Sequence, residues 1–247
     1  VPILIGIESL SSANLEKINK GQTVIECLQV IKFAERYGVK CCYNLMCGLP
    51  FENESDFIEA ERVIQFIKHC IPPFDLEIFR LTNGSAVQRN PAEYCVEHLG
   101  IRQSLEGMLI PKELQSDYIP FFLEFESTLP GLEKRKERWN TLIQDWIDFY
   151  YDYAKSGRPK LHSALYMRKN EYVLDIYDSR YGKGYSVYSF SGLQRAIYEY
   201  CNTIRSFSEI VSYFNLCSEE EIMEILNSFV EKKLMFKEEA NFLSLAI

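Results

Sequence analysis

The sequence predicts an α/β protein in which a parallel sheet or part of a (β/α) barrel comes first and a small α+β domain follows. Between residues 1 and 81, apolar segments of strand length alternate with amphipathic segments of helical length. The segment Ser156–Pro159 contains a Gly and a Pro, and after it the apolar period changes from helical to alternating. These observations place a domain boundary near residue 160.

The composition of the 247 residues is ordinary for a globular protein, with 47% hydrophobic and 25% charged residues. Lys and Arg number 27 against 35 Asp and Glu, so a nucleic-acid partner, which needs a basic face, is not expected. No apolar run reaches the length of a bilayer span and no targeting stretch opens the chain, so we expect a cytoplasmic protein with no membrane partner. The eight dispersed cysteines are expected to be reduced thiols.

The first part of the chain alternates strands with helices. Ser12 is the expected N-cap of the first helix, and Ser55 that of the third. Gly38 ends the second helix, and Pro72 follows the third. The expected strands are 1–7, 39–46 and 75–81, and the expected helices are 12–19, 23–37 and 55–70. This order is typical of a parallel sheet in which each helix crosses between neighbouring strands.

Residues 81–118 lack a clear period and are rich in turn residues, which predicts a long connection that acts as a lid or carries function. His98 lies within it and is expected to be a solvated loop histidine. A long helix over 131–154 follows, and the Trp and Tyr residues on one side of it are expected to pack into the core.

The last part of the chain changes from strands to helices and then back to a strand pair. The expected strands are 164–168, 172–177 and 185–190, the expected helices are 192–201, 206–214 and 219–232, and the final pair is 234–237 with 241–246. This order describes a small winged-helix-like domain. We therefore expect a first domain over 1–130, a connecting helix and linker over 131–160, and a last domain over 161–247.

Two turns at the ends of the first two strands carry residues suited to ligand binding. Glu8 and Ser9 follow the first strand, and Gly48 and Pro50 follow the second. Ligands of parallel sheets bind at the carboxyl ends of the strands, where a carboxylate or hydroxyl could hydrogen-bond a ribose or an amino-acid group. Gly48 would admit a ligand close to the backbone. The alternative is that Gly48 and Pro50 only form a loop and Ser9 only caps a helix, and spacing does not decide between the two.

The chain resembles a known family through a set of short motifs: Gly6-Ile7-Glu8-Ser9-Leu10-Ser11, Lys20-Gly21, Gly38, Asn44-Leu45-x-x-Gly48-x-Pro50-x-Glu52 and Pro72-Pro73. This set is similar to the second half of the radical S-adenosylmethionine (SAM) barrel, above all that of the cobalamin-binding radical SAM enzymes that modify ribosomally made peptides. The resemblance runs along essentially the whole chain. It implies a partial (β/α) barrel, made of the last three β/α units and completed by an N-terminal remainder of the same polypeptide.

The resemblance implies six SAM-binding candidates: Glu8, Ser9, Asn44, Gly48, Pro50 and Ser85. The first two would lie at the fourth barrel strand, near the ribose and methionine portion of SAM, and Asn44 would face the same ligand from the fifth strand. The Gly-Pro turn would border the adenine. Ser85 belongs to a segment at the sixth strand, Asn83-Gly84-Ser85-Ala86, that departs from the Arg-aromatic-Ser-Pro loop of the family.

Radical SAM chemistry needs a CxxxCxxC loop that holds a four-iron four-sulfur cluster, and this chain has no such loop. In the family the loop follows the first barrel strand, so the cluster ligands and any cobalamin domain are expected outside this chain. Cys41, Cys42 and Cys47 do not replace it, because adjacent strand residues point to opposite faces, and we expect them to be structural thiols.

The resemblance implies that a deoxyadenosyl radical in the parent enzyme abstracts hydrogen from a precursor peptide, with cobalamin-dependent methyl transfer as one form of the reaction. The alternative is a non-catalytic peptide-binding scaffold with a degenerate barrel.

The last domain is similar to the peptide-recognition element of ribosomal-peptide modifying enzymes. This similarity implies a leader peptide as partner, added as a strand beside the strand 185–190 and the helix 219–232. A winged helix also binds DNA, but the acidic residues Glu219–Glu221 at the start of the last helix oppose that function. A purely structural cap or dimer interface is the third alternative.

Overall fold

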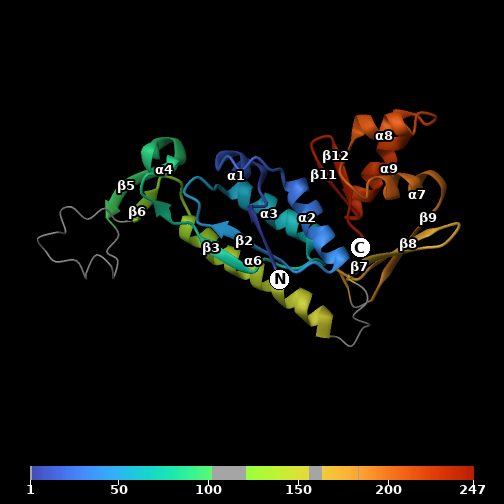
Figure 1. The fold of residues 1–247 in the computed structure, drawn as a ribbon, viewed down its shortest axis with the longest axis horizontal. Helices are drawn as coiled ribbons and strands as arrows, with labels where there is room; N and C mark the ends of the chain where they lie inside the picture. Colours follow the sequence, from blue (N-terminus) through green and yellow to red (C-terminus); the bar gives the residue numbers. More distant parts are fainter. Residues whose placement is uncertain (1, 102–120, 156–162, 183) are drawn as a thin grey trace, which may run out of the picture.

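Residues 2–101, 121–155, 163–182 and 184–247 are described by the computed structural model shown in Figure 1. They form four three-stranded sheets, and the first of these, in the order β1-β2-β3, is parallel. The expected α/β class and the parallel pairing of the first strands are thereby confirmed. No sheet within these residue ranges closes into a barrel.

Six elements make up the first part of the chain: β1 (Ile3–Glu8), α1 (Ser12–Lys17), α2 (Val24–Tyr37), β2 (Cys41–Cys47), α3 (Glu54–Ile67) and β3 (Asp75–Ile78). They match the predicted strands and helices, but two predicted caps are wrong. Ser11 caps α1 instead of Ser12, and Asn53 caps α3 instead of Ser55. The Asn53 side chain accepts from the Asp56 N–H while the Asp56 side chain accepts from the Asn53 N–H, and this reciprocal pair fixes the start of α3.

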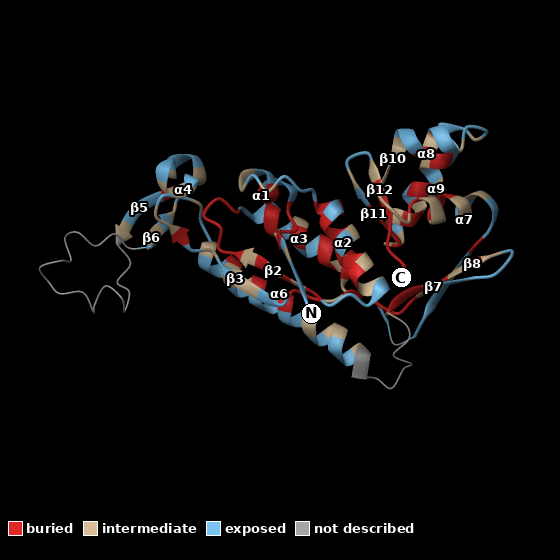
Figure 2. Cartoon of the chain, viewed as in Figure 1, coloured by how far each residue is buried: buried red, intermediate tan, exposed pale blue. Residues whose placement is uncertain are grey.

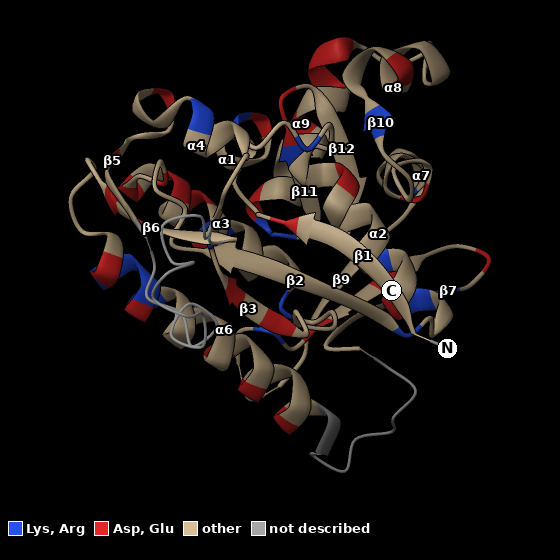
Figure 3. Cartoon of the chain, turned by 60° about the vertical axis from the view of Figure 1, so that its left-hand side comes forward, with Lys and Arg blue, Asp and Glu red and all other residues tan. Residues whose placement is uncertain are grey.

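The parallel sheet has one covered face and one uncovered face. The covered face, against α2 and α3, holds five buried side chains: Ile7, Cys41, Tyr43, Leu45 and Cys47. Full burial of an aliphatic or aromatic side chain stabilises the fold by about 1.5–3 kcal/mol. On the other face Leu4 of β1 is 79% exposed, and it lies beside Cys42 of β2 in the parallel register. Figure 3 looks onto this face, with α2 and α3 behind the strands.

A second sheet, which is antiparallel, occupies much of the region predicted as a long connection. It contains β4 (Leu81–Thr82), β5 (Val96–Ile101) and β6 (Phe122–Ser127) in the order β4-β6-β5, with the short helices α4 (Ala86–Arg89) and η1 (Pro91–Tyr94) between the first two strands. The prediction of an irregular connection is therefore wrong up to residue 101. The predicted third strand is also too long, because β3 ends at Ile78. Residues 102–118 lie outside the described ranges.

Helix α6 (Leu132–Lys155) packs against α3 and the parallel sheet. The ring of Trp139 meets the ring of Phe57 edge-on at 5.3 Å, and Trp146 Nε1 donates to the Cys70 carbonyl at 3.1 Å. Both Trp side chains are buried, which confirms the prediction for them, whereas Tyr150 and Tyr153 are half-buried. In the part of the chain that the structure describes, no helix combines the length and apolar character needed to cross a membrane. The predicted linker 156–159 lies outside that part.

Nine elements make up the last part of the chain: β7 (Leu165–Lys169), β8 (Leu174–Asp178), β9 (Ser186–Phe190), α7 (Gly192–Tyr200), β10 (Arg205–Ser206), α8 (Phe207–Tyr213), α9 (Glu219–Glu231), β11 (Met235–Glu238) and β12 (Asn241–Ser244). The predicted strands, helices and final strand pair are confirmed to within a few residues. The short strand β10 was not predicted, and it joins the final pair in the order β10-β12-β11.

Buried polar side chains connect this last part to α2 and α3 through hydrogen bonds. Arg180, 2% exposed, forms an ion pair with Asp178 and donates to the Phe66 carbonyl of α3 at 2.7 Å. Lys32 of α2 is also buried, and its Nζ donates to both oxygen atoms of Asn202 at 2.7 and 2.9 Å. Buried residues run from α2 and α3 into the strands of the last part, as Figure 2 shows.

The carboxylate of Glu238 makes a further link between the two parts. One of its oxygens accepts from the Val24 N–H at 3.1 Å and the other from the Ile25 N–H at 2.7 Å. These N–H groups belong to the first turn of α2, which has no intrahelical acceptors for them. The end of β11 therefore helps to cap a helix more than two hundred residues earlier in the chain.

Candidate functional site

The chain at the end of β1 turns Glu8 onto the uncovered face of the sheet. Glu8 has a φ of 66°, in the left-handed region that is strained for residues other than glycine, and the register with β2 shifts between Ile5 and Glu8. Its carboxylate accepts a hydrogen bond from Lys20 Nζ at 3.0 Å. A Cβ on Gly6 would lie 2.9 Å from Glu8 Oε1 and 2.8 Å from Lys20 Nζ. Gly6 therefore leaves room for this ion pair above the strand.

Ser9 points instead into the turn that begins α1. It is buried, and its hydroxyl oxygen accepts from the Ser11 N–H at 3.1 Å. Ser11 caps α1, and its own hydroxyl donates to Asp56 of α3 at 3.3 Å. These contacts are those of the local alternative, in which the serines shape the start of a helix.

Asn44 lies in the middle of β2, on the half-buried side of that strand. Its Nδ2 is 3.5 Å from Oε1 of Glu77 in β3, at the limit of a hydrogen bond. Its Oδ1 is buried and has no hydrogen-bond partner within the described ranges. A buried acceptor without a donor costs about 1–3 kcal/mol, so a ligand that donates a hydrogen bond to this oxygen would stabilise the fold.

Groups of the protein itself fill the turn after β2. Gly48 has a φ of 74°, and a Cβ there would collide with the side chain of Lys136 from α6. Pro50 is buried, and its carbonyl accepts a hydrogen bond from the Ser127 hydroxyl of β6. The left-handed turn and the Lys136 side chain both explain why residue 48 is a glycine. Lys136 occupies the space through which a ligand would approach the Gly48 backbone.

Ser85 lies apart from the other candidates in the topology. It follows β4 of the second sheet and caps α4, where its hydroxyl oxygen accepts from the Gln88 N–H at 3.2 Å. The structure therefore brings Glu8 and Asn44 to one sheet face and places Ser85 next to another sheet.

Lys20 and Glu52, two residues of the short motifs quoted from the sequence, make contacts that the sequence did not predict. Lys20 is the cation that pairs with Glu8. Glu52 is fully buried after the Gly-Pro turn, where it accepts from Trp139 Nε1 at 3.1 Å and lies 3.6 Å from Arg135 Nε. Burial raises the pKa of the Glu52 carboxyl to about 7, against the opposing effects of Trp139 and Arg135. The motif positions were visible in the sequence, whereas their partners were not.

The cysteines at the sheet behave as expected for structural thiols. Cys41 and Cys47 are buried, Cys42 is half-buried, and all are free. Burial raises the pKa of the Cys47 thiol to about 11, which disfavours the thiolate that an iron–sulfur cluster needs.

Comparison with known proteins gives one partial similarity. A 64-residue segment is 27% identical to "Uncharacterized protein MJ0486" of Methanocaldococcus jannaschii, covering 26% of this chain and 20% of that protein. The similarity thus spans about a fifth of the archaeal protein, whose description states no activity. No family model and no solved structure matches the chain.

Proposed function

We propose that this chain is the C-terminal part of a radical SAM enzyme that modifies a ribosomally synthesised precursor peptide. The observation that carries the proposal is the uncovered face of the β1-β2-β3 sheet. Parallel sheets are normally covered on both faces, yet Leu4 is 79% exposed, and in the described part of the chain β1 pairs with β2 alone. An N-terminal remainder of the polypeptide that supplies the other barrel strands fits both the open face and the free edge.

Two of the six candidate residues have groups that fit a SAM molecule at this face. The Glu8 carboxylate can accept from hydroxyl or amine donors, and Asn44 Oδ1 has no donor among the described residues. The other four are engaged in local contacts and would act through the shape of the turns. Glu8 and Asn44 would orient the ribose and the amino-acid portion of the ligand.

The cofactor chemistry would come from outside this chain. SAM bound at a four-iron four-sulfur cluster supplies a deoxyadenosyl radical, and the 247 residues contain no CxxxCxxC loop to hold that cluster. Cobalamin, where the reaction is a methyl transfer, would also bind outside them. The role left to this part is to position the ligand and the peptide.

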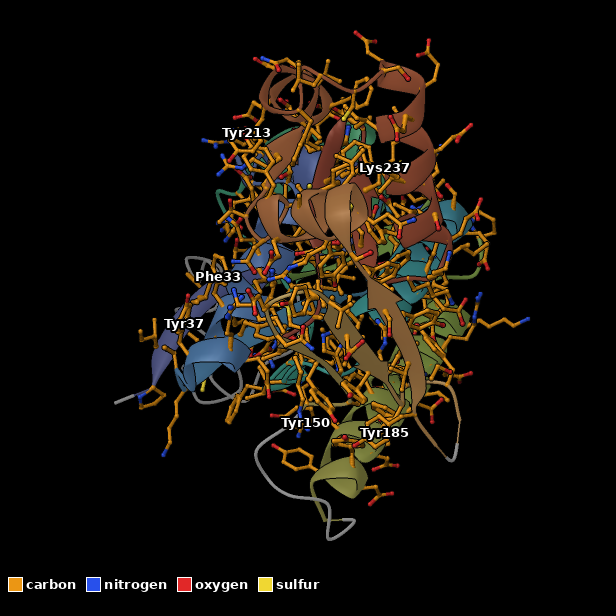
Figure 4. All side chains as sticks on the ribbon, turned by 90° about the vertical axis from the view of Figure 1, so that its right-hand side faces the viewer. Phe33, Tyr37, Tyr150, Tyr185, Tyr213 and Lys237 are labelled. Carbon is orange, nitrogen blue, oxygen red and sulfur yellow. The ribbon has the colours of Figure 1, made fainter. Side chains whose placement is uncertain are left out.

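The leader peptide of the precursor would bind at β9. In the described ranges β9 pairs with β8 alone, so its other edge is open, and Val187 on it is 53% exposed. Phe190 at the end of β9 meets Phe229 of α9 at 4.9 Å, so this end of the strand packs against that helix. Tyr185, which directly precedes this strand, is labelled in Figure 4 near the bottom of the view, and Tyr213 of α8 near the top. An extended peptide adds to such an edge through main-chain hydrogen bonds.

The test uses the full-length polypeptide with its natural N-terminus, purified without oxygen. We expect a cluster of about four irons per chain and conversion of SAM to 5′-deoxyadenosine. Glu8→Gln should raise the KM for SAM about tenfold, equivalent to about 1.4 kcal/mol, with the iron content unchanged. Glu61→Gln removes an exposed carboxylate on α3 and should leave the KM unchanged. Absence of iron, or iron without SAM cleavage, would refute the enzyme.

A non-catalytic peptide-binding scaffold is the second candidate, and the filling of the turn at Gly48 by Lys136 favours it. Both candidates bind a leader peptide, so peptide binding alone does not separate them. A full-length polypeptide that binds the peptide with unchanged affinity but holds no iron would identify the scaffold.

A further inference from the structure

Glu97, His98 and Glu126 form a cluster on the second sheet that the proposed function does not use. Each residue offers one ligand atom, and these atoms all lie within 4.8 Å of one another. His98 Nδ1 is 3.1 Å from Glu126 Oε2, and both side chains are well exposed, at 70% and 71%. No other group of three His, Cys, Asp or Glu residues in the described ranges comes as close.

The backbone brings these side chains together across two strands. Glu97 and Glu126 are direct partners in the antiparallel pair of β5 and β6. The register shifts between Glu97 and Gly100, and His98 has a φ of 50°. Neighbouring strand residues normally point to opposite faces, and this bulge turns His98 to the side of Glu97. Two carboxylates directly opposite each other destabilise a sheet, so a cation between them would stabilise this one.

We infer that this cluster binds a divalent transition-metal ion such as Zn²⁺. One imidazole nitrogen and two carboxylate oxygens form a mixed ligand set that suits this ion. Bond lengths of about 2.0–2.1 Å place the ligands of a tetrahedral site about 3.3 Å apart. The contact between His98 and Glu126 already has this spacing, and the exposed glutamates can reach it by rotamer changes.

The bound ion would join β5 to β6 and keep a coordination position open to solvent. Three protein ligands with one open position are the arrangement found in catalytic rather than structural zinc sites. The inference is independent of the proposed function, because these residues lie on the second sheet and not on the face that carries Glu8 and Asn44.

Titration of the 247-residue chain with Co²⁺ tests the inference, because the absorption spectrum of Co²⁺ separates nitrogen and oxygen ligands from the eight thiols. We expect one Co²⁺ per chain, visible d–d bands without a thiolate charge-transfer band, and displacement by Zn²⁺. His98→Asn and Glu126→Gln should each weaken binding about tenfold or more. Asn tolerates the left-handed backbone of His98, so that variant keeps the bulge.

Glu124→Gln is the matched control. Glu124 is exposed two residues from Glu126 on the same face of β6, and it contributes no ligand to the cluster. Equal weakening by Glu124→Gln and Glu126→Gln would show a diffuse acidic surface and overturn the inference. A thiolate band, or unchanged binding by His98→Asn, would overturn it as well. Circular dichroism checks each fold, and Glu97→Gln serves as the test if His98→Asn unfolds.

Discussion

The contact between residues 163–247 and helices α2 and α3 differs from the uncovered face of the parallel sheet in how polar groups are satisfied. In the contact, Arg180 and Lys32 are buried, and each donates to oxygen atoms within 3 Å. On the uncovered face, Glu8 has a strained backbone and Asn44 Oδ1 has no hydrogen-bond partner in the described part of the chain. Both buried cations of the contact have acceptors, although His69 Nδ1 beside them has no partner among the described residues, whereas the sheet face would gain stability from a ligand or a covering segment.

Breaking the contact at its most buried ion pair should have the largest effect. Arg180→Met removes the partner of Asp178 and the donor to the Phe66 carbonyl, so we expect a loss of about 3–5 kcal/mol of unfolding free energy in urea. Lys169→Met breaks the exposed ion pair with Glu199 and should cost less than about 1 kcal/mol. Equal losses in the two variants would contradict the comparison.

The carboxyl of Glu52, buried after the turn that follows β2, should make the stability of the protein depend on pH. Its pKa rises from 4.5 to about 7 in the folded protein, so the neutral form is favoured there. The stability that this provides is complete below pH 4.5 and lost as the pH rises through 7. From below pH 4.5 to above pH 7, the unfolding free energy of the wild type should fall by up to about 3 kcal/mol more than that of Glu52→Gln. Denaturation curves at both pH values measure this difference, and parallel pH dependences would contradict it.

Removing the hydroxyl of Tyr198, in the last part of the chain, should destabilise the fold less than Arg180→Met. It donates to the Leu234 carbonyl at 3.0 Å and accepts from the Ala246 N–H at 3.1 Å. Tyr198→Phe leaves both backbone groups buried without this partner, so we expect a loss of about 1–3 kcal/mol in thermal or urea unfolding. Tyr172→Phe, at an exposed position, is the control and should change stability by less than about 0.5 kcal/mol.

The smallest effect is expected on the uncovered face itself. Leu4→Ser should change the stability of the 247-residue chain by less than about 0.5 kcal/mol, because the side chain is already 79% exposed. Ile7→Ser, on the covered face of the same strand, should cost several times more. A large loss from Leu4→Ser would mean that the side chain is covered in solution.

The elements that could be predicted are those with a local signal. The strands and helices of the last part follow a clear alternation of periods, and Gly38 ends α2 in the left-handed conformation that its type favours. Strands β5 and β6 were missed because β5 pairs across the chain with residues such as Ser127, and no local pattern encodes such a partner. The cap of α3 moved to Asn53 because Asp56 completes a reciprocal pair with it.

Two of the six candidate residues, Glu8 and Asn44, lie on one sheet face as expected from the sequence, whereas their contacts could not be predicted. Asn44 lies on the uncovered face because it alternates with the buried residues of β2, and Glu8 reaches the same face through the register shift and left-handed backbone at the end of β1. The ion pair with Lys20 and the collision of a Gly48 Cβ with Lys136 depend on turns and on a helix far along the chain. Tertiary packing decides such contacts, so spacing within one motif does not reveal them.

The capping of α2 by Glu238 has a consequence for synthesis on the ribosome. The Val24 N–H meets an acceptor that lies 214 residues later in the chain. At about 5–20 residues per second, translation delivers that carboxylate about 10–40 s after the helix itself has been made. During this interval only the capping box of Thr23 and Glu26 caps the first turn of α2, and the Val24 and Ile25 N–H groups gain their acceptor once Glu238 has been made.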